Sequence, residues 1–256
     1  MPFDGIFAGK MIEELRQAVL CHVDKIYQPS FDELVFLLRK KDFSARLLLC
    51  ARSGAARVQF TEIKRENPES APMFCMLARK YFSGAKLTAV EQYGNDRLVR
   101  FCFETTDEMG DRVFPQVICE LMGAAANIVL VQGNGKIIDA VRRSDPATAK
   151  RLIQPGAGYE YPPSQGKVNP KTASAGEVAD AVLQKGGLPL AKALLETVDG
   201  FSPLVCREIA ERGFGEDILT ENADRETLIA AISRWRSCAD QTAPTLLLRE
   251  SIPFDY

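Results

Sequence analysis

Short runs rich in apolar and β-branched residues recur between polar turns over much of the first 140 residues, and such runs are typical of β-strands. The clearest run follows a turn signal at Gly94-Asn95, where Val99, Phe101 and Phe103 share one face. Earlier runs are short, rich in β-branched and apolar residues, and separated by polar or Gly-containing turns: DKIYQP, ELVFLLRK, ARLLLCA and ARVQFTEI. The pattern therefore predicts an antiparallel meander.

Two segments of this region have helical spacing instead. Apolar residues recur at helical intervals from Ile6 to Cys21, and Asp4 precedes them as the expected N-cap. A second helix is expected to begin at Pro72 and to end at Ser83-Gly84. Beyond it, two runs joined by Gly133-Asn134-Gly135 predict a β-hairpin.

These elements show no regular alternation of strands and helices, so they predict an α+β fold. We expect residues 1–165 to form a domain with an antiparallel β-sheet or sandwich and flanking helices. The Pro- and Gly-rich stretch 154–170 is predicted to be a linker at the domain boundary. Four helical segments predict a small all-α domain over 172–240, and 241–256 is expected to be strand-like.

Within the all-α domain, the middle two helical segments are linked by Asp199-Gly200-Phe201. Two helices around so short a Gly-containing turn form a helix-hairpin-helix pattern, which can present backbone N–H groups to a nucleic-acid phosphate. An ordinary packing hairpin in a helical bundle has the same spacing. The sequence leaves both interpretations open.

Charge and composition exclude several classes of function. A formal net charge of −2 over 256 residues argues against a protein that coats duplex DNA. Short basic patches at Arg79-Lys80 and Arg142-Arg143 are candidate RNA contacts, although a solvated surface would have the same sequence. There is no apolar run long enough to span a membrane and no secretory signal pattern at the start, so we expect a cytoplasmic protein.

Metal, redox and nucleotide sites also lack sequence support. Seven cysteines without a C-x-x-C pair predict buried, reduced thiols and no zinc site. His22, the single histidine, is expected at the end of the first helix and not as a general base. The chain has no glycine-rich phosphate-binding motif. We therefore expect no metal and no cofactor.

Arg97 is a charged residue placed where the strand of Val99 and Phe101 begins. It has the parity of their apolar face, so its side chain is expected at the rim of a buried surface, either snorkelling or paired. Its neighbour Asp96 belongs to the turn. Local pattern alone predicts only a hairpin here.

Five motifs taken together resemble the N-terminal region of the NFACT family, which includes the fibronectin-binding protein A-like proteins of bacterial ribosome quality control. In order along the chain they are FDGIFAGKMIEEL, KIYQP, PMFCMLARKY, GNDRLVRF and ELMGAAANIVLV. They span about the first 165 residues, and a helix-hairpin-helix domain is expected next. Family members continue with a coiled-coil arm and a further domain, so the resemblance implies an N-terminal part of a longer protein.

The resemblance implies binding to a large ribosomal subunit obstructed by peptidyl-tRNA, through tRNA and rRNA. It further implies recruitment of alanyl-tRNA for untemplated alanine tailing of the stalled chain. The matching positions for tRNA contact are Asp96, Arg97 and Asp4. Arg grips phosphate or stacks on a base, and a carboxylate accepts from a base amino group. The run Gly123–Asn127 lacks the basic residue that the family commonly has there, so this loop lacks the phosphate contact that the family pattern implies.

The role implied by the resemblance is that of an RNA-binding module without catalytic chemistry. Two other functions are alternatives to it. Pro2 would become an amine nucleophile on removal of Met1, as in DNA glycosylases of the formamidopyrimidine class, but Phe3 replaces the expected glutamate and no cysteine zinc finger exists. The family's older name instead implies a fibronectin-binding adhesin, for which the sequence offers no secretion signal. Binding to tRNA and rRNA remains the leading hypothesis.

Overall fold

The structure is a computed structural model that describes residues 3–240, 247–249 and 252–255. The chain divides into two units. We call Ala8–Tyr93 with Arg97–Pro163 the sheet unit. The helical unit consists of the segment from Ser164 onward together with the residues up to Phe7 and the turn Gly94–Asp96.

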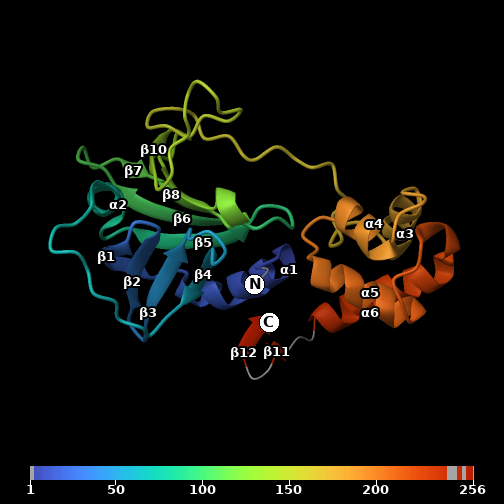
Figure 1. The fold of residues 1–256 in the computed structure, drawn as a ribbon. Coiled ribbons are helices and arrows are strands. Elements are labelled where there is room, and N and C mark those ends of the chain that lie inside the picture. Colours follow the sequence, from blue (N-terminus) through green and yellow to red (C-terminus); the bar gives the residue numbers. More distant parts are fainter. Residues whose placement is uncertain (1–2, 241–246, 250–251, 256) are drawn as a thin grey trace. The chain divides into compact units, whose positions relative to one another are not determined.

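The sheet unit is built on one antiparallel sheet, as the short strand-like runs and their turns predict (Figure 1). Its strand order is β10-β9-β8-β6-β5-β1-β2-β3-β4, with β7 paired to β6. The strands are β1 (His22–Ser30), β2 (Glu33–Lys40), β3 (Phe43–Cys50), β4 (Arg57–Phe60), β5 (Lys86–Gln92), β6 (Leu98–Thr106), β7 (Arg112–Val113), β8 (Gln116–Glu120), β9 (Asn127–Val131) and β10 (Ile137–Ala140).

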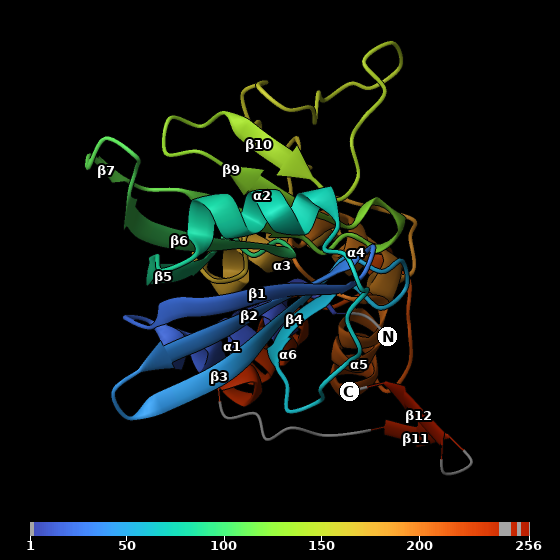
Figure 2. The same cartoon turned by 90° about the vertical axis from the view of Figure 1, so that its left-hand side faces the viewer.

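The sheet has two halves, β1–β4 and β5–β10, which are joined through β1 and β5. These two strands share the ladder pair His22 and Lys86, and the N–H of Val23 donates to the carbonyl of Ala85 at 2.9 Å. Helix α2 (Met73–Phe82) packs against both β1 and β10, along the sheet in Figure 2. Pro72 precedes α2 and Gly84 follows it with φ of 76°, as the sequence predicts.

A cluster of three phenylalanines forms the centre of this core. Phe36 of β2 stacks on Phe103 of β6 at 5.9 Å between centroids, and Phe82 of α2 packs edge-on against both. All three side chains are fully buried. The helix and the two halves of the sheet are therefore held by one hydrophobic contact.

The first helix is shorter than its apolar spacing predicts. Helix α1 runs over Gly5–Leu15, a 3₁₀ turn follows at Arg16–Ala18, and His22 begins β1 instead of ending a helix. Leu20 has a left-handed φ of 71°, and its N–H donates to the carbonyl of Leu87. Pairing with β5 thus replaces the helical hydrogen bonds that would have extended α1 to Cys21.

The helical unit contains the four predicted helical segments, packed around a core that includes Val182, Leu194, Ile209 and Ile232. The helices are α3 (Ala175–Leu183), α4 (Leu190–Thr197), α5 (Pro203–Phe214) and α6 (Arg225–Asp240). A capping box of Ser174 and Glu177 begins α3, and Gly215 ends α5 with φ of 79°. The described part of the predicted C-terminal strand segment forms β11 (Leu247–Arg249) and β12 (Ile252–Asp255); 241–246, 250, 251 and 256 lie outside the described residues.

The Pro- and Gly-rich stretch predicted to be a linker is packed along its first part. The N–H of Ile137 donates to the carbonyl of Ala157, and Tyr159 and Tyr161 pack against the core of the sheet unit. In the helical unit, Val168 forms a bridge with Val198. Aromatic and amide groups within this stretch therefore bind it to folded elements, despite its composition.

All seven cysteines are free, as predicted, but they are not all buried. Cys102 is half-buried and Cys238 is exposed, and the others lie in the interior: Cys21, Cys50, Cys75, Cys119 and Cys206. Desolvation raises the pKa of the Cys206 thiol to about 12, so this group stays protonated at neutral pH.

Candidate nucleic-acid interface

Asp4, one of the predicted tRNA contacts, caps the start of α1. Its Oδ1 accepts hydrogen bonds from the N–H groups of Ile6, at 3.1 Å, and Phe7, at 2.9 Å. These are donors that a helix leaves without intrahelical partners, so the predicted N-cap is confirmed. A half-buried carboxylate is thereby held in a fixed position in the helical unit.

The turn that carries Asp96 is anchored by its neighbour Asn95. Gly94 has φ of 60°, and Asn95 is completely buried. The Nδ2 of Asn95 donates to the carbonyl of Asp199, between α4 and α5, at 2.8 Å. The Oδ1 of Asn95 is buried and has no hydrogen-bond partner among the described residues.

The start of α1 meets the same α4–α5 turn. The N–H of Gly5 donates to the carbonyl of Gly200 at 3.1 Å. A Cβ at Gly5 would overlap the carbonyl oxygen of Asn95 and would lie 2.8 Å from the Cα of Gly200. Three segments far apart in sequence therefore pack backbone against backbone, and glycine is required at their contact.

This arrangement bears on the helix-hairpin-helix interpretation. Asp199 and Gly200 use their carbonyl groups to bind Asn95 and Gly5, and the N–H of Asp199 donates to the carbonyl of Val168 at 2.9 Å. The turn thus serves as a packing hairpin for the other two segments. Presentation of its N–H groups to a nucleic-acid phosphate stays a prediction.

The carboxyl group of Asp199 adds a second acid beside Asp96. Burial, followed by the negative charge of Asp96, raises the pKa of Asp199 above its ordinary value. Hydrogen bonds from the backbone of Asn95 and Gly200 and the positive charge of Lys167 oppose this rise. Two acids therefore lie near each other at this turn, and backbone donors hold the carboxyl group of Asp199. Such groups can accept hydrogen bonds from base amino groups or sugar hydroxyls.

Arg97 begins the second segment of the sheet unit, directly after Asp96. It is half-buried, and its carbonyl accepts from the N–H of Leu121 at 2.8 Å. Val99, Phe101 and Phe103 of β6 are buried, so the predicted apolar face is confirmed. The two residues of the pair thus belong to different units, and the chain passes from one unit to the other at the Asp96–Arg97 peptide bond.

Arg79 and Lys80 lie in the last turn of α2. The Nε of Arg79 donates to the carbonyl of Ile26 at 2.9 Å, which binds the helix to β1. Lys80 is exposed and forms an ion pair with Glu108 at 3.5 Å. Lys80 remains accessible for RNA contact, whereas Arg79 has a structural partner.

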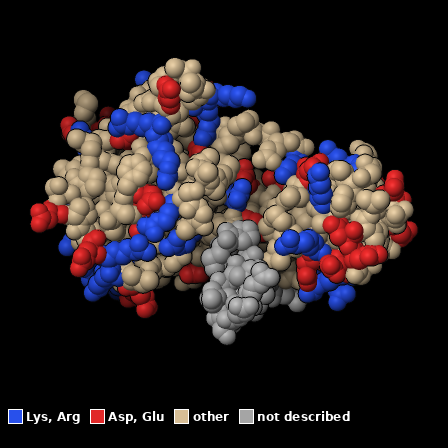
Figure 3. All heavy atoms as spheres, viewed as in Figure 1, with Lys and Arg blue, Asp and Glu red and all other residues tan. Residues whose placement is uncertain are grey.

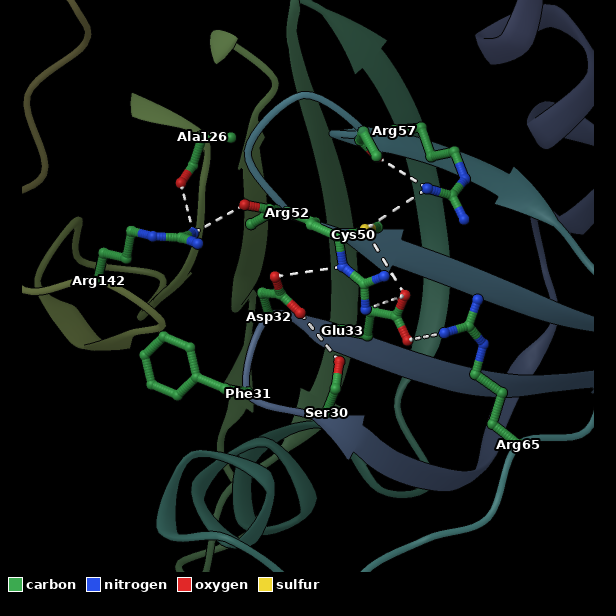
Figure 4. Close-up of polar contacts among 12 residues, drawn as sticks. Ser30, Phe31, Asp32, Glu33, Cys50, Arg52, Arg57, Arg65, Ala126 and Arg142 are labelled. Carbon is green, nitrogen blue, oxygen red and sulfur yellow. Dashed lines mark hydrogen bonds and ion pairs between the residues drawn. The ribbon is translucent and has the colours of Figure 1, made fainter. Parts of the chain in front are cut away.

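Arg142 has structural contacts that its sequence context does not reveal (Figure 4). Its Nη1 donates to the carbonyls of Ala51 and Ala126, each at 2.8 Å, and its guanidinium lies 6.0 Å from the ring of Phe31. The neighbouring Arg143 is half-exposed and binds the buried carboxylate of Asp139 at 2.8 and 3.0 Å.

The loop that departs from the family pattern is one of the segments that Arg142 holds. Gly123–Ala125 form a 3₁₀ turn, and Asn127 exchanges hydrogen bonds with the backbone of Arg142 at 2.7 and 2.9 Å. The Arg142 side chain thus supports a loop without a basic residue of its own. Its predicted role as an RNA contact is not tested by these bonds.

Sequence reasoning found Asp4, Asp96 and the α4–α5 turn separately and missed their meeting through Asn95 and Gly5. The available signal was the repetition of an acid or amide beside glycine in FDG, GND and VDG. Among the described residues there is no cluster of His, Cys, Asp and Glu that would hold a metal ion. Pro2, the nucleophile of the glycosylase hypothesis, lies outside them.

In the described part of the chain, the helices are too short or too polar to cross a lipid bilayer. Surface charge is mixed: Figure 3 shows Lys and Arg side chains gathered over the sheet unit, with Asp and Glu among them. This agrees with the small net charge of the chain.

Comparison with known proteins identifies the family of this chain. The family model for the NFACT N-terminal and middle domains matches residues 4–256. The Rqc2 homolog RqcH of Bacillus subtilis is 34% identical over 216 residues, which cover 83% of this chain and 38% of the relative. RqcH of Streptococcus suis is 34% identical over 250 residues, 96% of this chain and 42% of the relative. The chain thus spans about two fifths of the length of these relatives.

A solved structure shows the same fold. The crystal structure of the fibrinogen binding protein from Staphylococcus aureus has a TM-score of 0.79 and 33% identity, over 93% of this chain and 82% of that chain. The family model covers the chain from Asp4 onward, including Asp4 and Gly5 of the FDG segment and the whole of the GND and VDG segments. The chain therefore belongs to the NFACT family.

Proposed function

We propose that this chain is the RNA-binding N-terminal part of a ribosome quality control factor, acting in the cytoplasm on obstructed large ribosomal subunits. The assignment to ribosome quality control is supported by the relatives named RqcH, which match across most of the chain. The observation that carries the proposal is the Gly94–Asp96 turn, which Asn95 fixes to the α4–α5 turn of the helical unit. A fixed acid beside an arginine suits recognition of an unpaired nucleotide.

In this proposal the chain binds and does not catalyse. Arg97 contacts a tRNA phosphate or stacks on a base, while Asp96 and Asp4 accept hydrogen bonds from base or sugar donors. Alanyl-tRNA held in this way would be used by the ribosome's own peptidyl transfer to add alanine to the stalled chain. Arg143 and Lys80, both half-exposed or more, are further candidate contacts to rRNA.

The test is RNA recovery with the protein at its natural length. Asp96→Ala and Arg97→Ala, made separately, are expected to lower co-purifying tRNA at least fivefold while the ribosomal subunit is still recovered. Loss of one charge-assisted contact accounts for a change of this size, because such contacts are worth about 1.5–3 kcal/mol. Sequencing of the recovered RNA identifies the tRNA.

A matched control is present in the same chain. Asp111 and Arg112 form a second Asp-Arg dipeptide after a glycine, in the exposed hairpin that leads into β7. Asp111→Ala and Arg112→Ala should leave tRNA recovery unchanged. Wild-type tRNA levels in both Asp96→Ala and Arg97→Ala would show that the site is assigned wrongly.

Adhesion is the second candidate, because the similar Staphylococcus aureus structure is described as a fibrinogen binding protein. It is distinguished by labelling intact cells with a membrane-impermeant reagent. Labelling of the protein together with fibronectin or fibrinogen capture by intact cells would favour adhesion. Signal confined to lysed cells would exclude it.

A further inference from the structure

One side of the β1–β4 half of the sheet carries a cavity that the proposed function does not use. The cavity has a volume of about 220 Å³ and lies within the sheet unit. Its floor is the sheet itself, and the segment Thr61–Asn67 after β4 forms part of its wall.

Strand register explains how the floor is made. Tyr27 pairs with Val35, Val35 with Leu48, and Leu48 with Gln59, so these side chains form one row across β1, β2, β3 and β4. Val35 and Leu48 are buried, and Tyr27 packs against them. The floor is thus apolar with an aromatic side chain at one end.

The neighbouring rows bring cations to the same face. Arg46 lies in the row of Leu37 on one side, and Arg57 lies in the row of Cys50 on the other. The segment after β4 adds Lys64 and Arg65. Four cationic side chains therefore line this small cavity, and none of the described residues that line it is an aspartate or glutamate.

Two of the four are held in place by the fold. The Nη1 of Arg65 donates to Oε2 of Glu33 at 2.9 Å, and the Glu33 side chain is fully buried. The Nη1 of Arg57 donates to the carbonyl of Ala55 at 2.8 Å, and its Nε donates to Gln59 at 3.2 Å. Figure 4 shows both guanidinium groups on the same side of Glu33. Their remaining N–H groups are pre-positioned for an anion.

The other two cations are available to a ligand. Neither Arg46 nor Lys64 has a side-chain hydrogen bond or ion pair with any other described residue. Like charges that share a small cavity repel one another, and a bound anion would remove this repulsion. Guanidinium groups bind phosphate through paired hydrogen bonds, and an apolar floor with a tyrosine suits the flat face of a base.

We propose that this cavity binds a nucleoside monophosphate unit. The phosphate is held by Arg46, Arg57, Lys64 and Arg65, and the base lies over Val35 and Leu48 against Tyr27. The volume suits one nucleotide entering from the open side. The same chemistry is offered by a free nucleotide and by a nucleotide of single-stranded RNA, and both probes are used to separate these sources.

The experiment measures binding to the 256-residue chain by calorimetry with AMP, adenosine and inorganic phosphate, and by anisotropy with a labelled 5′-phosphorylated hexa-adenylate. AMP should bind at least tenfold more tightly than adenosine or phosphate. Arg46→Ala combined with Lys64→Ala should weaken AMP binding at least tenfold. Tyr27→Leu should weaken AMP binding and leave phosphate binding unchanged.

The control removes two positive charges elsewhere on the sheet unit. Lys136→Ala combined with Lys150→Ala, both at exposed positions, should change AMP binding less than twofold. Equal losses in the two double variants would overturn the proposal, as would failure of the wild-type chain to bind both AMP and the oligonucleotide. The cavity is assigned to RNA if the oligonucleotide binds more tightly than AMP and this binding is lost in the Arg46 and Lys64 double variant. It is assigned to a free nucleotide if the two probes bind with equal affinity.

This site can fail independently of the proposed function. Asp96→Ala and Arg97→Ala should leave AMP binding unchanged, because neither residue lines the cavity. Loss of tRNA recovery in those variants together with no AMP binding would reject the cavity alone. The opposite result would reject only the tRNA assignment.

Discussion

Gly200 is constrained in two separate ways. Its φ of 74° is one that side chains rarely adopt, and a Cβ at this position would overlap Asn95. Gly187, in the same unit, has a nearly identical φ of 76° but open space around its Cα. The two glycines therefore separate backbone strain from close packing.

Gly200→Ala is expected to destabilise the helical unit by more than about 3 kcal/mol, since left-handed backbone strain of about 1 kcal/mol is joined by a clash with Asn95. Gly187→Ala should cost only about 1 kcal/mol, the strain alone. Urea unfolding followed by fluorescence of Trp235, the single tryptophan, measures both. Equal losses would mean that Asn95 moves aside without cost.

Among elements, α2 contacts both halves of the sheet through one side chain, Phe82. Phe82 contacts Phe36 and Phe103, which come from the two halves of the sheet, at 6.2 and 5.2 Å between ring centroids. The adjacent Tyr81 is half-buried and points to a different side of the helix. Substitution of Phe82, compared with substitution of Tyr81, tests how far the contact of Phe82 with Phe36 and Phe103 stabilises the sheet unit.

Phe82→Ala should cost about 3–5 kcal/mol of unfolding free energy, because a fully buried ring is replaced by a cavity. Tyr81→Ala should cost less than about 1 kcal/mol, as is usual for partly exposed positions. Urea unfolding monitored by far-ultraviolet circular dichroism compares them. A small loss in Phe82→Ala would contradict the view that this contact holds both halves and the helix.

At the scale of the whole molecule, three carboxyl groups make the helical unit sensitive to acid. Hydrogen bonds from the start of α3 lower the pKa of Glu177, Arg225 lowers that of Asp180, and the backbone of Thr227 lowers that of Asp224. A carboxyl group whose pKa is lower in the folded state stabilises that state above its unfolded pKa. The contribution is lost as the pH falls through the folded value.

The triple variant Glu177→Gln, Asp180→Asn, Asp224→Asn should unfold at a lower urea concentration than wild type at pH 6. The difference should shrink as the pH falls below the usual range of carboxyl pKa values, because wild type then loses the same interactions. Trp235 fluorescence reports on this unit, since its ring packs 4.6 Å from that of Phe201. The control removes three other negative charges from the same unit: it changes the exposed residues Glu196, Glu216 and Glu221 to Gln. If the difference between wild type and the Glu177, Asp180 and Asp224 variant did not depend on pH, this explanation would be rejected.

The sequence by itself determined the local elements and the family motifs. Period-two spacing predicted Val99, Phe101 and Phe103 as one buried face, and Asp4 was recognised as a helix cap, because such features depend on neighbouring residues. The predicted end of the first helix was wrong, because pairing of Leu20 with β5 interrupts an otherwise helical pattern. Local preference was overridden there by a distant strand.

Only the tertiary structure decided which distant residues meet. Asn95 and Asp199 are hydrogen-bonded although more than one hundred residues separate them in sequence. Gly5 fits because it has no Cβ, since the backbone atoms of Asn95 and Gly200 lie too close for one. The cationic cavity likewise needs the register of four strands to bring Arg46 and Arg57 to the same face. The pattern along a chain states which side of an element is apolar, but the identity of its partner follows from packing and from the pairing of the whole sheet.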